Sequence, residues 1–173
     1  MANAVLVIDM QKGFLHEGAA LYCGEAARAI IPAVTRLLDE ELARGSALFF
    51  TLDIHDPDDK EFEMWPPHCV VGTEETEFIP ELLPYVAQGT VIDTRRYSAF
   101  FETDLAERLA ELKPDRLIVC GVCTDICVLH SVAGARFRDY PVTVLRDCVA
   151  SFDAEAHEWG LKHMEKILGA QVV

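Results

Sequence analysis

The sequence predicts an α/β protein in which one mainly parallel sheet lies between two layers of helices. Short runs of apolar, β-branched residues alternate with segments that repeat apolar residues at helical spacing, and this alternation is typical of a parallel sheet covered on both faces. The chain has 173 residues, of which 51% are hydrophobic. This length can bury one core but is short for two domains. We therefore expect residues 1–173 to form a single three-layer α/β/α domain.

The first predicted elements are a strand, a helix and a second strand. Ala4–Ile8 is a continuous apolar run, as expected for a strand that is buried on both faces, and Asp9 follows at its carboxyl end. Apolar residues at helical spacing predict a helix over Ala26–Arg44, which should stop at Gly45. The next strand is predicted at Ala47–Leu52.

Between residues 53 and 84 the periodicity fades. This segment contains a cluster of acidic residues and the prolines at positions 57, 66, 67, 80 and 84, so it is predicted to be a long loop outside the regular alternation. Long loops of this kind commonly carry function. We expect residues 53–84 to form a loop that binds metal and substrate.

The second half of the chain returns to the alternation. In order, the predicted elements are a strand at Thr90–Ile92, a helix at Asp104–Leu112, a strand at Arg116–Cys120, a helix from Thr124 to about Arg138, a strand at Val142–Leu145, a helix at Asp153–Leu168 and a short strand at Gln171–Val173. Ligands bind beyond the carboxyl ends of the strands in such sheets. Asp9, Asp53 and the segment after Cys120 should therefore meet at one edge.

Charge and cysteine content exclude several classes of function. The formal net charge of −14 disfavours binding to nucleic acid or to an anionic membrane, because both would be repelled. The apolar run after Asn3 is too short for a signal peptide or a membrane span, so we expect a cytoplasmic protein. Six cysteines without an export signal are expected to be reduced. Cys123 and Cys127 are four residues apart, which does not fit a structural zinc pair.

Cys127 is the candidate nucleophile. It falls in the first turn of the predicted Thr124 helix, where unpaired backbone N–H groups and the helix dipole should lower the pKa of a thiol and can hold an oxyanion. Asp9 ends a buried strand at the same edge and could serve as general base, with its pKa raised by apolar surroundings. The alternative is that Cys127 is a small buried residue and Asp9 a backbone cap.

The loop after Asp53 offers a second candidate site. Asp53 and His55 should point the same way in an extended segment, and Glu61 and His68 follow in the same loop. Two imidazoles with carboxylates suit zinc, iron or manganese. The alternative is a polar loop whose histidines and acids are simply solvated.

The segment Arg95–Phe101 mixes arginines with aromatic rings. It could line a pocket for a flat polar ligand. The alternative is a helix entry with a hydrophobic staple and solvated arginines.

Four groups of residues together resemble the isochorismatase-like hydrolases, and within them the nicotinamidases. They are Val7–Gln11 with Phe14, Asp53-x-His55 ahead of Pro66-Pro67-His68, Arg96–Phe100, and Gly121–Val128. The resemblance spans nearly the whole chain in the same order. It implies a Rossmann-like fold.

The resemblance also implies a reaction, the hydrolysis of nicotinamide to nicotinate and ammonia. Asp9 would take the proton of Cys127, and the thiol would attack the amide carbonyl to form a thioester that water resolves. A cis peptide bond between Val122 and Cys123 would direct backbone N–H groups at the oxyanion.

Cofactor and substrate contacts follow from the same resemblance. Asp53, His55 and His68 correspond to ligands of a divalent metal that binds the pyridine nitrogen, with Glu61 as a fourth candidate; zinc is expected, with iron or manganese as alternatives. The rings of Phe14, Trp65 and Tyr97 would flank a small amide substrate. The family habit also predicts a homo-oligomer.

One position departs from the family pattern. A lysine is expected three residues before Tyr97, and this chain has Thr94 there. A threonine cannot stabilise the charges of Asp9 and Cys127 as an ammonium would, so Arg95 or Arg96 is a candidate replacement. Two alternatives to a nicotinamidase therefore stay open: another isochorismatase-like hydrolase, and a catalytically impaired relative that binds a ligand.

Overall fold

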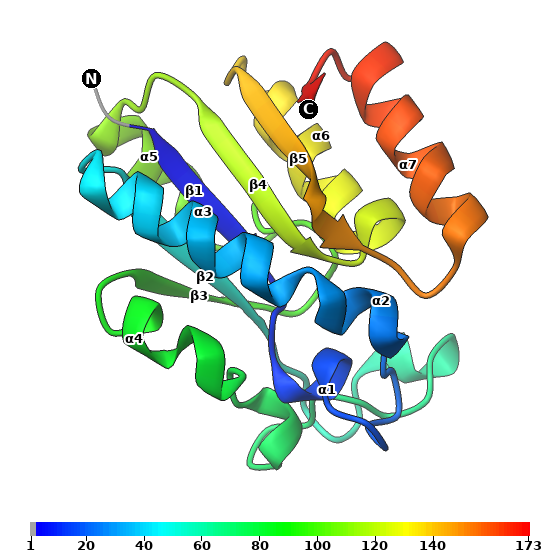
Figure 1. Ribbon diagram of the computed structural model, residues 1–173. Helices are drawn as coiled ribbons and strands as arrows, with labels where there is room; N and C mark the ends of the chain where they lie inside the picture. Colours follow the sequence, from blue (N-terminus) through cyan, green and yellow to red (C-terminus); the bar gives the residue numbers. More distant parts are fainter. Residues whose placement is uncertain (1–2) are drawn as a thin grey trace.

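A six-stranded parallel sheet forms the centre of the protein in the computed structural model, which describes residues 3–173 (Figure 1). The strand order is β3-β2-β1-β4-β5-β6, and every strand pairing is parallel. The strands are β1 (Ala4–Ile8), β2 (Ala47–Asp53), β3 (Thr90–Thr94), β4 (Leu117–Val122), β5 (Val142–Ala150) and β6 (Gln171–Val172). The predicted α/β fold with a parallel sheet is confirmed.

Helices cover both faces of this sheet. One face carries α2 (Gly24–Ala29), α3 (Ile31–Ala43) and α4 (Leu83–Val86), and the other carries α5 (Leu105–Leu112), α6 (Leu129–Arg136) and α7 (Ala154–Lys166) (Figure 1). A short helix, α1 (Lys12–Leu15), follows β1 and was not predicted. Within residues 3–173, no helix has the length and apolar character needed to cross a bilayer.

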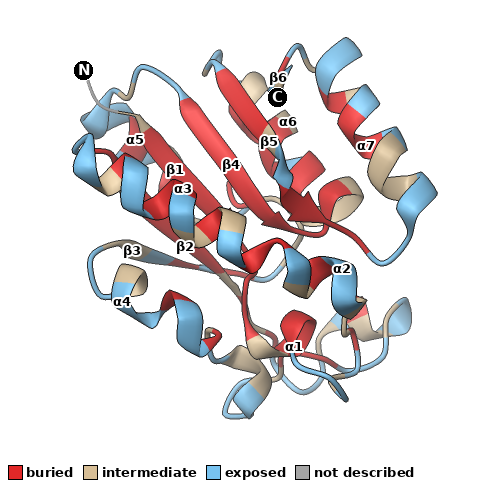
Figure 2. Ribbon diagram, in the orientation of Figure 1, coloured by how far each residue is buried: buried red, intermediate tan, exposed pale blue. Residues whose placement is uncertain are grey.

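The apolar run in β1 explains the two cores. Val5 and Val7 belong to the core under α3, whereas Leu6 and Ile8 belong to the core under α5, α6 and α7, because successive side chains of a strand point to opposite faces. All five residues of β1 are buried, and Figure 2 shows the central strands buried along most of their length.

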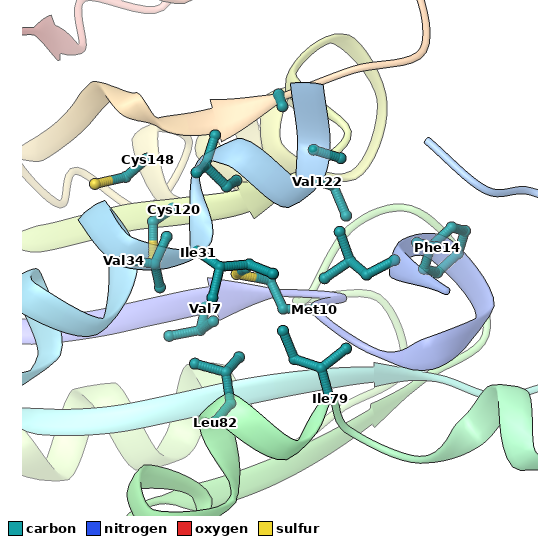
Figure 3. Close-up of a cluster of buried hydrophobic side chains, with 14 of the residues drawn as sticks. Val7, Met10, Phe14, Ile31, Val34, Ile79, Leu82, Cys120, Val122 and Cys148 are labelled. Atoms are coloured by element: carbon teal, nitrogen blue, oxygen red, sulfur yellow. The ribbon is translucent and has the colours of Figure 1, made fainter. Parts of the chain in front are cut away.

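The core under α3 continues to the carboxyl edge of the sheet. Figure 3 shows Val7 and Met10 close to Ile31 of α3, with Val122 at the end of β4 and Phe14 of α1 farther along the same cluster. Val122 and Phe14 also line the pocket described below. The packed core therefore supports the wall of the site directly.

The predicted helix over Ala26–Arg44 is two helices. α2 ends at Ala29 and α3 begins at Ile31, with Pro32 in its first turn. Proline has no N–H with which to continue a helix, but it fits the first turn of a new one. The predicted helix is therefore interrupted at Ile30.

The strand predicted at Arg116–Cys120 is also longer than expected. β4 runs through Gly121, which therefore does not turn the chain into the next helix. Gly121 has a φ of +113°, and a Cβ there would lie 2.1 Å from the carbonyl oxygen of Ile8. Glycine thus lets β4 pass close to β1 one residue before Asp9. β5 also extends beyond its predicted end, to Ala150.

The segment between β2 and β3 leaves the regular alternation, as predicted. Besides α4, it contains three short 3₁₀ turns, at Lys60–Glu63, Glu74–Thr76 and Pro80–Leu82. His55 and His68 in this segment are buried, so the loop packs against the carboxyl edge of the sheet.

Candidate active site and metal centre

The carboxyl ends of four neighbouring strands bring the predicted residues together. Asp9 follows β1, Asp53 ends β2, Thr94 ends β3 and Val122 ends β4. In the sheet Asp53 pairs with Thr94, and Ile8 pairs with Gly121. The edge expected from the strand pattern is therefore the edge at which the candidate site lies.

Asp9 is held at the point where the chain leaves β1. Its φ is +50°, and its N–H donates a 2.9 Å hydrogen bond to the hydroxyl of Thr51, which donates in turn to the Asp9 carboxylate. Burial raises the pKa of Asp9 to about 7, the charge of Asp53 adds to this rise, and hydrogen bonds from Thr51 and Cys127 oppose it. A carboxylate with this pKa can accept and return a proton near neutral pH.

The candidate nucleophile lies in a tight turn after β4. The peptide bond between Val122 and Cys123 is cis, as the resemblance implies. Thr124–Val128 then forms a π-helical turn, in which the carbonyl of Cys123 accepts hydrogen bonds of 3.1 Å from the N–H groups of Ile126 and Val128. The turn leads directly into α6 and places Cys127 at the pocket.

The expectation that the helix terminus lowers the pKa of Cys127 is wrong. Burial raises the pKa of this thiol well above its usual value, and the negative charges of Asp9 and Asp53 raise it further. The loss of hydration and two nearby carboxylates outweigh the dipole of a short turn. Cys127 therefore keeps its proton at neutral pH and needs a base to become a nucleophile.

Asp53, His55 and His68 form a compact cluster on the other side of the pocket. One ligand atom from each lies within 4.8 Å of the others, and all three residues are buried. The Nε2 atom of His55 is 3.0 Å from Asp53 Oδ1, and the Nε2 atom of His68 is 3.4 Å from Asp53 Oδ2. Although burial would raise the pKa of Asp53, its close contacts with the imidazoles of the two histidines lower it, so a carboxylate is available as a ligand.

The outer contacts of the cluster fit a divalent cation. Nδ1 of His55 faces Asp59 at 3.1 Å, and Nδ1 of His68 faces the carbonyl of Pro66 at 2.9 Å, which leaves both Nε2 atoms directed at the cluster. Within residues 3–173, two buried side-chain polar atoms make no hydrogen bond of normal geometry: His55 Nε2, which lies 3.0 Å from Asp53 Oδ1, and Glu61 Oε2, which lies 3.6 Å from the guanidinium of Arg96. Such atoms are rare unless something binds them. Nitrogen and carboxylate donors together suit zinc, iron or manganese.

A pocket of about 370 Å³ lies between Cys127 and the candidate metal-ligand cluster, of which Asp53 and His68 line it. Its lining includes all three predicted ring residues, Phe14, Trp65 and Tyr97, together with Asp53, Glu61, His68, Val122, Cys123 and Cys127. The indole N–H of Trp65 donates a 3.0 Å hydrogen bond to the hydroxyl of Tyr97, which fixes the two rings relative to each other. Aromatic walls with a few polar groups among them suit a ligand with an aromatic ring.

Neither arginine replaces the missing ammonium. Arg95 pairs with Glu102 at 2.8 Å on the surface, and Arg96 pairs with Asp59 at 3.0 Å, behind His55. Thr94 is buried, and its hydroxyl donates to the carbonyl of Leu52 at 3.3 Å. Among the residues that the structure describes, no lysine or arginine forms an ion pair with Asp9.

Sequence reasoning missed several residues of the site. Thr51 carried a usable signal, because it is a hydroxyl residue in an apolar strand and lies two positions before Asp53, on the same side of the strand. Leu21, Ile126 and Phe152 also line the pocket. Their positions depend on loops that pack together only in the folded chain, and no local pattern indicates them.

Comparisons with known proteins agree on the fold and the family. Residues 3–173 match the isochorismatase domain. The crystal structure of nicotinamidase/pyrazinamidase PncA from Bacillus subtilis superposes with a TM-score of 0.93 at 37% identity and covers 100% of each chain. Pyrazinamidase of Pyrococcus horikoshii in complex with zinc gives a TM-score of 0.89 at 31% identity, over 100% of this chain and 99% of the other. A probable inactive nicotinamidase of Arabidopsis thaliana is 30% identical over 95% of this chain and 89% of its own length.

Proposed function

Because the chain belongs to the isochorismatase family of hydrolases, we propose that it is an amidohydrolase that converts nicotinamide, or a similar small aromatic amide, to the acid and ammonia. One observation carries this proposal. Asp9 lies close enough to the thiol of Cys127 for each group to shift the pKa of the other, and Cys127 lines a pocket walled by aromatic rings. A buried base beside a half-buried thiol is an arrangement that suits covalent acyl transfer.

The proposed reaction has two halves, formation and hydrolysis of a thioester, and in each half Asp9 accepts one proton and returns it. Cys127 attacks the amide carbonyl while its proton moves to Asp9, and backbone N–H groups of the Thr124–Val128 turn hold the oxyanion. The C–N bond then breaks, ammonia leaves with the proton from Asp9, and a thioester to Cys127 remains. Water attacks the thioester, Asp9 takes a proton from the water, and the acid leaves as Cys127 regains its proton.

The metal-ligand cluster would orient the substrate. Asp53, His55 and His68, with Glu61 beside them, would hold a divalent cation, and zinc is our first choice because a related pyrazinamidase is solved with zinc. When bound, this cation would supply a Lewis acid for the ring nitrogen of the substrate. The rings of Phe14, Trp65 and Tyr97 would then hold the aromatic plane.

A second candidate function is ligand binding without turnover. Thr94 stands where the family pattern has lysine, and no cation pairs with Asp9 in residues 3–173. The similarity to a probable inactive nicotinamidase is consistent with this alternative. Against it, Asp9, Asp53, His55 and His68 are buried close to a pocket that Cys127 lines, and a site that only binds has no physical need for the thiol and base.

The direct test is ammonia release from nicotinamide by the purified protein after its metal content has been measured. We expect turnover that is proportional to protein concentration and absent from a Cys127→Ala variant. No ammonia from nicotinamide or from related pyridine and pyrazine carboxamides, in a protein loaded with metal, would overturn the amidase proposal and favour ligand binding.

A further inference from the structure

Phe152 covers one side of the pocket with a half-exposed ring. It lies in the connection between β5 and α7, and 42% of its surface is exposed. Its ring stacks on that of Trp65, with centroids 6.2 Å apart and planes at 23°. Trp65 is fixed in turn by its hydrogen bond to Tyr97. A large apolar ring in a loop is therefore held against the rigid wall of the site.

Phe152 also separates the pocket from a neighbouring cleft. The cleft has a volume of about 780 Å³, compared with about 370 Å³ for the pocket, and Phe152 is the residue that lines both. The remaining walls of the cleft come from the start of α2, the end of β5 and the start of α7. Truncating this one ring should therefore join the two spaces.

The cleft adjoins the nucleophile end of the pocket. Cys23, in the wall of the cleft, has its sulfur 3.3 Å from that of Cys123 in the pocket. Ala150, also in the cleft, pairs with Val122 in the sheet. The metal-ligand residues Asp53 and His68 line the pocket, not the cleft. The cleft therefore borders the side of the pocket at which the amide group of a bound substrate would react, away from the metal-ligand residues.

The walls of the cleft suit an apolar group. Its polar side chains already have partners, since Ser151 donates to Asp125, His157 Nδ1 lies 2.8 Å from the hydroxyl of Thr124, and Glu25 accepts a 2.8 Å hydrogen bond from Tyr22. Other lining residues are Ala26, Val149 and Ala154. Burying a hydrocarbon substituent there would leave these three hydrogen bonds in place.

We propose that Phe152 is a specificity-determining residue that restricts this enzyme to primary amides, because its ring closes the passage that an apolar substituent on the amide nitrogen would need. This inference rests on the proposed amidase function and narrows its substrate class. With a secondary amide the chemistry balances in the same way: the C–N bond breaks, the C–S bond of the thioester forms, and the departing amine takes the proton that Cys127 gave to Asp9.

The test compares N-benzylnicotinamide with nicotinamide in a Phe152→Ala variant. We expect the ratio of kcat/KM for the benzyl amide to that for nicotinamide to rise at least about tenfold, with benzylamine and nicotinate as products. Phe152→Tyr, which keeps the ring, should behave as the unmodified protein. Phe101→Ala is the matched control, because Phe101 is 47% exposed and lines a separate groove, and it should leave the ratio unchanged.

Binding measured in a Cys127→Ala background separates this inference from the amidase proposal. There, Phe152→Ala should strengthen the binding of N-benzylnicotinamide relative to nicotinamide by at least about tenfold, as measured by calorimetry. The role of Phe152 is overturned if the ratio of the two affinities in the Phe152→Ala variant stays within about threefold of its value with Phe152 present, while the circular dichroism spectrum is unchanged. If nicotinamide is bound but not hydrolysed by the unmodified protein, the amidase proposal fails, and the binding ratio still decides whether Phe152 closes the passage.

Discussion

The hydroxyl of Thr51 donates a hydrogen bond to the carboxylate of Asp9 and accepts one from the backbone N–H of the same residue. Asp9 has a positive φ at the end of β1, and Thr51 lies inside the neighbouring strand β2. One side chain thus holds both the backbone and the carboxylate of the proposed base. The position and the proton affinity of Asp9 consequently depend on a residue 42 positions away.

Thr51→Val should move the pH dependence of the reaction. The hydrogen bond from Thr51 lowers the pKa of Asp9, so its loss raises this pKa, and the proton acceptor becomes available only at higher pH. We expect the acid limb of kcat/KM to shift upward by about one pH unit, which corresponds to about a tenfold loss below pH 7. Thr51→Ser should restore the original profile.

Thr143→Val is the control for this substitution, because Thr143 lies at the start of β5, does not line the pocket, and accepts a 3.1 Å hydrogen bond from Arg116. Superimposable pH profiles for Thr51→Val and the unmodified protein would contradict the role of the hydroxyl.

Asp9→Asn should abolish turnover and stabilise the fold at alkaline pH. Burial raises the pKa of Asp9 from 3.8 to about 7, so the folded state binds the proton more tightly than the unfolded chain. The protein therefore loses stability as the pH rises from about 4 to about 7. Removing the carboxylate should increase the free energy of unfolding by as much as about 4 kcal/mol at pH 8 and by only about 1–2 kcal/mol at pH 5. Urea denaturation at pH 8 and pH 5 measures these free energies. An equal increase at both pH values would contradict the raised pKa of Asp9.

Cys127→Ala should remove turnover but preserve ligand binding. The thiol is the proposed nucleophile, whereas the aromatic walls and the metal-ligand residues that would hold the ring remain in place. We expect at least about a thousandfold loss of kcat and a nicotinamide affinity within about threefold of the original, measured by calorimetry. Cys148→Ala, which removes a buried thiol outside the pocket, is the control. Residual turnover in Cys127→Ala near the original rate would eliminate the thioester mechanism.

A His55→Ala, His68→Ala double variant should lose bound metal. These residues supply two of the three ligand atoms in the cluster, and the remaining carboxylates of Asp53 and Glu61 cannot retain a divalent ion at the affinity of a mixed set. We expect metal content, measured by mass spectrometry of the purified protein, to fall to about a tenth or less. His163→Ala on α7 should keep its metal. Unchanged metal content in the double variant would show that the ion binds elsewhere.

Thr94→Lys should increase turnover. Thr94 ends β3 beside Asp53 and is buried, so an ammonium placed there would oppose the negative charges of Asp53 and Asp9 and favour an ionised pair of Asp9 and Cys127. We expect kcat/KM for nicotinamide to rise at least about tenfold. If kcat/KM instead falls in a Thr94→Lys variant that remains folded, the site works without this cation, and Thr94 is needed for the packing around it.

Local pattern was enough to predict most of the fold. The apolar run of β1 could only be a strand buried on both faces, and the acids that follow β1 and β2 could be placed at one edge because parallel strands end together. The errors were local as well. The break at Ile30 and the passage of β4 through Gly121 depend on Pro32 and on the close approach to Ile8, which helical or strand periodicity alone does not reveal.

The sequence by itself determined which chemical groups are present and in what order: a carboxylate after the first strand, a loop with histidines and acids after the second, and a thiol in the turn after the fourth. The tertiary structure decided how those groups behave. Desolvation raises the pKa values of Asp9 and Cys127, and packing between distant segments brings Thr51 to Asp9 and Phe152 to Trp65. Burial and long-range contacts arise only when separate elements assemble, so no local run of residues specifies them.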